Sequence, residues 1–284
     1  MGALALAALF LTGCGKDPGP EKGYGLFVWD ENMVLDGAFA QMDEVIQKQD
    51  IDALYQVLSE KMPGSSNLDN YVDHFTKKGT DIYGLAGQPE WGLEEDGFSL
   101  KNEMEMIDDA NRLLKTKGRI KGIVADVEPY LLDQWDGTDG EREELMETYA
   151  RGLTEAYKEA REKGLEMLVC IPTFYDHTNP RVLEQIVKEG CDGIAVMNYN
   201  RADEYGQMET EVELAEKYGK KVICIYELQE PGKHDLEDIN TYYLEGLDEL
   251  EESRTDLEER FGYEGLSFAL HYYEPLKELL DKEE

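Results

Sequence analysis

Two acidic side chains close an apolar run of the chain at a spacing that suits acid–base chemistry. The run IKGIVADVEPY covers residues 120–130. A strand places alternate side chains on opposite faces, so Asp126 and Glu128 share one face, while the other face is aliphatic and suits packing against helices. Two carboxyl groups in a poorly solvated cleft resist ionising together, which raises the pKa of one of them. We therefore predict that both are catalytic and that Glu128 is a general acid. A buried polar layer is the alternative.

A third carboxyl group ends a later apolar run. Glu227 lies in the segment KKVICIYELQE, residues 220–230, and the pattern allows its side chain to face either way. An inward Glu227 would stand about 5 Å from Glu128 and act as the nucleophile of a retaining glycoside hydrolase. Otherwise, a salt bridge to Arg201 or to a lysine on a neighbouring loop would account for it.

Aromatic, amide and imidazole side chains gather at the ends of the same runs. Sugar rings have apolar C–H faces that stack on aromatic rings, and their hydroxyl groups hydrogen-bond to polar side chains. The partner that this composition predicts is a glycan or an oligosaccharide. The residues that we predict to bind it are Trp29, Tyr55, Trp91, Tyr130, Tyr175, Asn198, Tyr199, Gln229, His271 and Tyr273.

A scaffold that brings many strand ends together must position these residues. From residue 23 the chain alternates short runs rich in Val, Ile and Leu with longer amphipathic stretches, in eight pairs. Continuous apolar runs are typical of strands buried on both faces of a parallel sheet. We expect strands at residues 23–29, 52–57, 80–87, 120–130, 166–174, 191–200, 220–230 and 264–273.

Helical patterns fill the intervals between these strands. Each of six such stretches is followed directly by Gly, which commonly stops a helix. Eight βα units predict a (β/α)8 TIM barrel in one domain, residues 23–284, with its site at the carboxyl ends of the strands. A doubly wound open sheet is the weaker alternative, because no Gly-rich phosphate turn follows the first strand. The helices are expected at residues 68–78, 100–117, 140–163, 180–189, 209–218 and 236–261.

The charge of the chain excludes some partners. Its 284 residues include 63 Asp and Glu against 28 Lys and Arg, a formal net charge of −35. Such an acidic surface repels phosphate backbones and anionic headgroups, which excludes a nucleic-acid partner and a charge-steered membrane role. Most of this charge falls on predicted outer helices, where we interpret it as a solvated surface. The pattern does not indicate an oligomeric state.

The sequence predicts no metal and no cofactor. Its four histidines include no His-x-His pair, and no Cys/His spacing typical of a metal site occurs. Cys170, Cys191 and Cys224 lie in or beside apolar runs, so we expect them to be buried core residues, with a single disulfide as a minor alternative.

The amino terminus has the features of an export signal. Residues 3–11 form an apolar run that leads to LTGC, ending at Cys14. This segment resembles the lipobox of bacterial lipoproteins, in which the cysteine is lipidated. The resemblance implies a signal segment at 1–14, lipidation of Cys14, a tether at 15–22 and an extracytoplasmic protein that contacts the membrane only through its lipid anchor.

The predicted strand ends resemble those of the chitinase-like family 18 glycoside hydrolases. That family ends its fourth strand in Asp-x-Glu and its sixth in Met-x-Tyr, which match Asp126-Val127-Glu128 and Met197-Asn198-Tyr199. The resemblance implies that Glu128 protonates the leaving oxygen and that Asp126 orients an N-acetyl group of the substrate, which itself acts as the nucleophile. It also implies a role in the site for Tyr199.

The chain departs from that family at several positions. Two earlier acidic positions are Lys121 and Val124, Asn200 replaces an Asp, and no Trp ends the eighth strand. A second group, the retaining hydrolases with a Glu after strands four and seven, is matched only by Glu128 and Glu227. We therefore keep two hypotheses open: a cell-surface glycoside hydrolase, and a non-catalytic carbohydrate-binding lipoprotein on the same fold.

Overall fold

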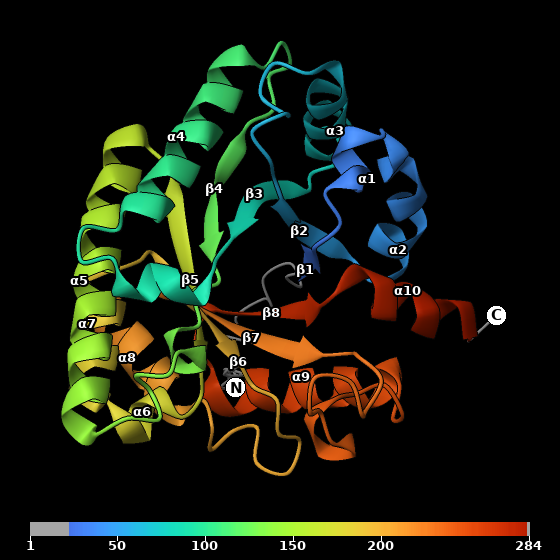
Figure 1. Cartoon of the computed structure of the whole chain (residues 1–284). Coiled ribbons are helices and arrows are strands. Elements are labelled where there is room, and N and C mark those ends of the chain that lie inside the picture. The colour runs from blue at the N-terminus through green and yellow to red at the C-terminus, as the bar shows by residue number, and fades with distance from the viewer. Residues whose placement is uncertain (1–22, 283–284) are drawn as a thin grey trace, which may run out of the picture.

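Eight short apolar strands form the centre of the molecule. The computed structural model describes residues 23–282. The strands are β1 (Tyr24–Val28), β2 (Ile51–Val57), β3 (Asp81–Ala86), β4 (Ile120–Ala125), β5 (Glu166–Pro172), β6 (Gly193–Met197), β7 (Lys221–Glu227) and β8 (Leu266–His271). Each strand pairs in parallel with the next, and β8 pairs with β1, so the sheet closes into a barrel (Figure 1). The predicted (β/α)8 barrel in one domain is confirmed, and all eight predicted strands are present.

Helices connect the strands and cover the outside of the barrel (Figure 1). The α-helices are α1 (Asn32–Leu35), α2 (Asp43–Lys48), α3 (Ser66–Thr76), α4 (Phe98–Leu113), α5 (Asp139–Lys163), α6 (Tyr175–Thr178), α7 (Pro180–Glu189), α8 (Glu209–Tyr218), α9 (Leu247–Phe261) and α10 (Tyr273–Lys282). The 3-10 helices are η1 (Ala38–Met42), η2 (Pro89–Leu93), η3 (Pro129–Leu131) and η4 (Asp238–Asn240).

Two predicted helices are longer than the observed ones. The prediction of a helix over 236–261 is wrong at its start, because only α9 is an α-helix and residues 236–246 form a loop that contains η4. Gly246 stands directly before α9 with φ 88° and ψ 179°, a conformation that interrupts a helix. The predicted helix over 100–117 ends early, at Leu113, because Leu114 turns to an extended ψ of 131°.

Glycine ends three of the outer helices as predicted. Gly164, Gly219 and Gly262 follow α5, α8 and α9 with φ values of 69°, 64° and 58°. This left-handed conformation costs Gly little, because it has no Cβ atom. Gly190 follows α7 with φ −108°, so that helix ends without the left-handed turn.

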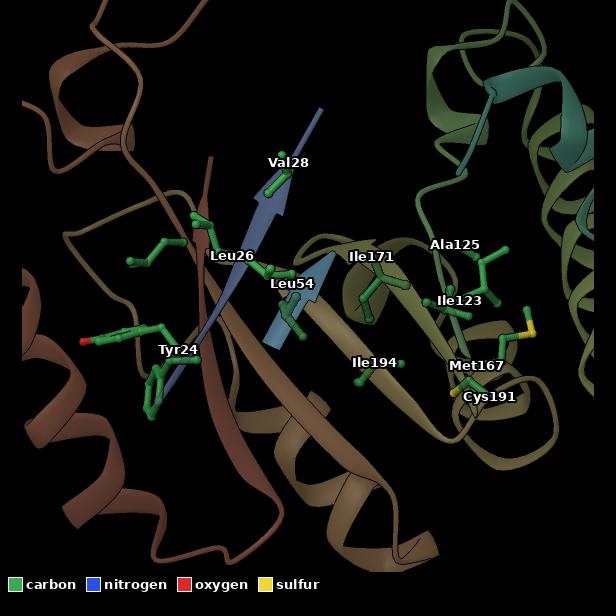
Figure 2. Packing of buried hydrophobic residues seen from close by; sticks show 14 of the residues in the cluster. Tyr24, Leu26, Val28, Leu54, Ile123, Ala125, Met167, Ile171, Cys191 and Ile194 are labelled. Carbon is green, nitrogen blue, oxygen red and sulfur yellow. The ribbon is translucent and has the colours of Figure 1, made fainter. Parts of the chain in front are cut away.

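Apolar side chains on the two faces of the strands form two layers. Outward-facing residues such as Leu26, Ile123 and Ile171 belong to the larger layer, between strands and helices (Figure 2). Inward-facing residues, among them Val124 and Ile225, fill the barrel. Because side chains alternate along a strand, residues 126 and 227 continue the inward rows at the carboxyl end of the barrel.

The cysteines belong to these layers. Cys170, Cys191 and Cys224 are buried with free thiols, as predicted. The signal segment at 1–14, the lipidation site Cys14 and the tether at 15–22 lie outside the described residues. Within residues 23–282, no helix combines the length and the apolar character that crossing a membrane requires.

Candidate active site

A cavity with two adjoining lobes opens at the carboxyl ends of the strands. The lobe next to β1, here called the Trp29 lobe, has a volume of about 450 Å³ and is lined by Trp29, Asp126 and Cys170 among others. The lobe next to β5, here called the Phe174 lobe, has a volume of about 620 Å³ and is lined by Tyr130 and Phe174 among others. The residues that line both lobes are Glu128, Met197, Tyr199, Gln229, His234 and His271.

Asp126 lies in the Trp29 lobe, directly after β4. Its backbone N–H donates to the Ala86 carbonyl oxygen at 2.9 Å, which fixes the chain where it leaves the sheet. Burial, and then the negative charge of Glu128, raises the pKa of Asp126 to about 6. Asp126 therefore holds a proton well above the pH at which an exposed aspartate loses it.

Glu128 stands at the junction of the two lobes. Pro129 occupies the first position of η3 immediately after it, so the chain turns at this point. The Tyr130 hydroxyl donates a hydrogen bond to Glu128 Oε1. Because Glu128 lines both lobes, its carboxyl group can reach an atom that links a group in one lobe to a group in the other.

Glu227 faces inward, and hydrogen bonds occupy both of its oxygens. The side chain is 3% exposed. Its Oε1 accepts from the backbone N–H groups of Leu228 at 2.9 Å and Gln229 at 2.7 Å. Its Oε2 lies 2.8 Å from Nδ1 of His271. The alternative of a salt bridge to Arg201 is wrong, because Arg201 pairs with Glu245.

His271 joins Glu227 to an aromatic residue at the edge of the cavity. The Trp29 indole N–H donates to His271 Nε2 at 3.1 Å. The ring of Tyr199 lies nearly parallel to the imidazole, 6.3 Å away between centroids and at an angle of 29°. Glu227, His271 and Trp29 therefore form one hydrogen-bonded chain across β7, β8 and the end of β1.

The structure brings half of the predicted substrate-binding residues to the cavity and leaves the other half outside. Those that line the cavity are Trp29, Tyr130, Tyr199, Gln229 and His271. Those that the structure does not bring to either lobe are Tyr55, Trp91, Tyr175, Asn198 and Tyr273.

The misplaced residues have identifiable positions. Tyr55 lies inside the barrel and lines a different cavity together with Asp52, which lies near the start of β2. Asn198 follows inward-facing Met197 and therefore faces out, where its Nδ2 donates to the Glu204 carbonyl oxygen at 3.0 Å. Tyr175 and Tyr273 are buried in the packing of α6 and α10, and Trp91 packs against the outer core layer.

Several residues that were not predicted to bind substrate also line the cavity. His234, in the loop between β7 and α9, has its Nδ1 3.1 Å from Gln229 Nε2. Phe174 and Leu236 come from the loops after β5 and β7, and Tyr272 follows β8. Their positions after strand ends were the available signal, but the helix expected from residue 236 obscured the loop.

Within the described residues, no group of three or more His, Cys, Asp or Glu side chains is arranged to hold a metal ion.

Comparisons with known proteins show the fold. No protein-family model matches this chain, and no curated protein sequence matches it. A candidate alpha-L-fucosidase from Bacteroides thetaiotaomicron is similar in structure, with a TM-score of 0.58 and 13% identity over 98% of each chain. A GH18 chitinase from Pseudoalteromonas aurantia has a TM-score of 0.53 and 11% identity over 91% of this chain and 99% of its own.

A third similar structure is the C-terminal domain of a candidate chitinase from Desulfitobacterium hafniense. Its TM-score is 0.52 and its identity 11%, over 73% of this chain and 66% of that one, slightly under two thirds of its length. These proteins are (β/α)8 barrels of the glycoside-hydrolase type, and the present chain shares their architecture. Because the named activities differ between them, the shared fold does not specify a substrate.

Proposed function

We propose that the protein is a glycoside hydrolase that acts on a neutral or N-acetylated glycan, with Glu128 as the proton donor. The observation that carries the proposal is the place of Glu128 at the junction of the two lobes, with Asp126 in the Trp29 lobe. Lobes of about 450 and 620 Å³ fall in the usual range of small-molecule sites. A sugar in each lobe would put the linking oxygen next to Glu128.

Asp126 supplies the acidity of this pair. Because its pKa is raised to about 6, Asp126 keeps a proton in mildly acidic solution, next to the carboxyl group that meets the substrate. This proton can pass to Glu128, and from Glu128 to the leaving oxygen as the glycosidic bond breaks. Asp126 itself lines only the Trp29 lobe, where it faces the sugar ring.

Glu227 is poorly suited to attack the sugar. Three donors engage its oxygens, and each of these hydrogen bonds stabilises the carboxylate and lowers its nucleophilicity. For an N-acetylated substrate, we propose that its N-acetyl group serves as the nucleophile instead. Its carbonyl oxygen attacks the anomeric carbon while Glu128 protonates the leaving oxygen. Water then adds to the anomeric carbon, opens the cyclic intermediate and returns a proton to Glu128.

Replacing Glu128 by Gln tests the proposal. Wild type, E128Q and the control E90Q are incubated with a panel of N-acetylated and neutral oligosaccharides, and products are identified by mass spectrometry. Glu90 is exposed in η2 at the same end of the barrel, so E90Q removes the same charge without touching the cavity. We expect cleavage by wild type and E90Q and none by E128Q. Equal cleavage by E128Q, or none by wild type, would contradict the proposal.

One observation favours a second candidate function, carbohydrate binding without turnover. Val124 is fully buried in the barrel interior, directly before Asp126 in its inward row, and Lys121 pairs with Asp81. Both occupy places where the chitinase-like family has acidic residues. Binding of an oligosaccharide by wild type, with no product after prolonged incubation, would support this second function.

We also propose that the protein is attached to the outside of a bacterial membrane through a lipid on Cys14. The support for this is the sequence pattern that ends in LTGC. Expression in bacteria fed with an alkyne-labelled fatty acid should label the wild type and leave C14A unlabelled. Equal labelling of both would exclude Cys14 as the lipidation site.

A further inference from the structure

We propose that Glu227 and His271 are positioning residues that hold the Trp29 indole as a wall for the sugar bound in the Trp29 lobe. This inference rests on the proposed function for the identity of the ligand. It assigns the buried carboxylate of β7 a role that is neither nucleophile nor acid.

The hydrogen bonds define which nitrogen of His271 carries the proton. The indole N–H of Trp29 is only a donor, so Nε2, which it meets at 3.1 Å, must present a lone pair. Nδ1 then carries the hydrogen and donates it to Glu227 Oε2 at 2.8 Å. A neutral imidazole in this tautomer satisfies both partners.

Glu227 is itself held by the backbone. Two backbone N–H groups, those of Leu228 and Gln229, point at its Oε1 at 2.9 and 2.7 Å. The Leu228 N–H also donates to the His271 carbonyl oxygen at 3.0 Å, so rotation of the carboxylate would leave the buried Gln229 N–H unsatisfied. Glu227 and His271 are also paired directly across β7 and β8. The chain of hydrogen bonds is thus anchored in the sheet at one end and reaches Trp29 at the other.

Trp29 is placed to contact a ligand. The residue is 36% exposed and lines the Trp29 lobe. One neighbour, Phe27, lies nearly parallel to it with centroids 6.5 Å apart, and His271 meets it edge-on at 6.3 Å. Trp29 follows β1 and lies outside it, so these contacts and the bond to His271 are what orient the indole. An indole fixed in this way loses little conformational entropy when a sugar stacks on it.

Replacing Glu227 by Gln offers a sharp test, because the substitution keeps the shape and reverses one hydrogen bond. The two backbone N–H groups require the amide oxygen at the Oε1 position, so the amide NH2 must face His271 Nδ1 as a donor. His271 would then carry its hydrogen on Nε2, where it meets the N–H of Trp29. Two N–H donors, those of His271 Nε2 and the Trp29 indole, would face each other, and the hydrogen bond between these residues would be lost.

The test measures the hydrogen bond between Trp29 and His271 separately from sugar binding. Imidazole 15N shifts and the Trp29 indole N–H signal, assigned with W29F, are recorded for wild type, E227Q and H271F. Affinity for N-acetylglucosamine trisaccharide and for cellotriose is measured by calorimetry. We expect the Nδ1–H tautomer in wild type, the Nε2–H tautomer in E227Q, and a shifted indole signal in both variants. Affinity for the sugar that wild type binds should fall about tenfold, the loss expected for one hydrogen bond.

A double-mutant cycle provides the control. If His271 acts through the indole N–H, H271F should weaken binding in wild type and have no further effect in W29F. An indole signal unchanged in E227Q and H271F, or equal losses of affinity in both backgrounds, would overturn the inference. If H271F does not fold, E227Q alone tests the inference. An unchanged His271 tautomer and an unchanged indole signal in E227Q would also overturn the inference. Failure of wild type to bind either sugar would count against the proposed function. The 15N and indole signals would still report on the hydrogen bond between His271 and Trp29.

Discussion

Asp126 shows how the surroundings of one residue decide its chemistry. Burial and the charge of Glu128 raise its pKa to about 6. The thiol of Cys170, on the neighbouring strand β5, has a pKa raised well above its ordinary value by burial and by Asp126, so it stays protonated and hydrogen-bonds to Asp126. The hydrogen bond from the Cys170 thiol lowers the pKa of Asp126, but burial and Glu128 outweigh it, so the carboxyl group retains a proton up to about pH 6.

The first prediction concerns the pH dependence of hydrolysis. In the proposed mechanism cleavage needs the Asp126 proton, which is lost as the pH rises through about 6, so kcat/KM should fall above that value. D126N should be less active and should lose this inflection. The profile of kcat/KM against pH for both proteins checks the prediction, and an inflection near 6 that persists in D126N would refute it.

The second prediction concerns Tyr130. Its hydroxyl donates to Glu128 Oε1, and a hydrogen bond to a charged group is worth on the order of 1.5–3 kcal/mol. Y130F should lower kcat about tenfold or more and change KM little. Y243F removes a similar bond, from Tyr243 to Glu278 on the exposed surface, and should leave kcat unchanged. Steady-state kinetics of wild type, Y130F and Y243F test this prediction. An equal kcat in Y130F and wild type would count against a role for the Tyr130 hydroxyl.

Sequence reasoning placed some site residues and misplaced others for physical reasons. The period of two along a strand predicted that Asp126 and Glu128 share the inward face, and both line the cavity, because the rule depends only on local backbone geometry. The same rule, carried past the end of β6, would have placed Asn198 outside. The bond between Glu227 and His271 depends on the register of β7 against β8, which no local pattern encodes.

At the scale of elements, loops beyond the strands complete the site. Residues 228–246 connect β7 to α9, and this loop contributes Gln229, His234 and Leu236 to the cavity. The strands themselves were predictable because buried parallel strands are continuous apolar runs. The start of α9 was not, because the loop before it also has helix-like spacing, and the backbone of Gly246 decides the boundary.

The third prediction concerns the glycines of the helices. Gly219 ends α8 with φ 64° and has open space around its Cβ position, so G219A should destabilise the protein through backbone strain alone, by about 1 kcal/mol. Gly140 is the second residue of α5 and has room for a Cβ atom, so G140A should stabilise the protein, by up to about 0.5 kcal/mol. Chemical denaturation measures both. The same sign for the two variants would contradict this account.

At the scale of the whole molecule, the acidic charge divides into two parts. Of the Asp and Glu residues in 23–282, only Glu211 and Glu227 are buried as whole residues, and the rest are half-buried or exposed. Exposed charge of one sign keeps the protein soluble and repels polyanions. The few acidic groups in or near the cavity are the ones that bear on chemistry.

The fourth prediction concerns overall stability against pH. Both carboxyl oxygens of Glu211, on α8, are buried, and this burial raises its pKa from 4.5 to about 8; its own backbone N–H opposes the rise, and Asp176 adds to it. Between pH 4.5 and about 8 the folded protein therefore keeps a proton on Glu211 that the unfolded chain has already lost. The free energy of unfolding should fall as the pH rises across that window.

Replacing Glu211 by Gln should remove this dependence. At pH 8.5, E211Q should be more stable than wild type by on the order of 1–3 kcal/mol, and at pH 4.5 the two should differ less. Urea denaturation at the two pH values measures the effect. A wild type that gains stability between pH 5 and 8 more steeply than E211Q would show that the sign is wrong.

A crystal structure of E128Q with a bound N-acetylated oligosaccharide tests the role of Glu128 most directly. We expect one sugar ring in the Trp29 lobe, stacked on Trp29, and another in the Phe174 lobe. We also expect the oxygen linking the two rings to lie within hydrogen-bond distance of residue 128. A sugar bound away from this junction, or confined to one lobe with no linkage at residue 128, would contradict this role.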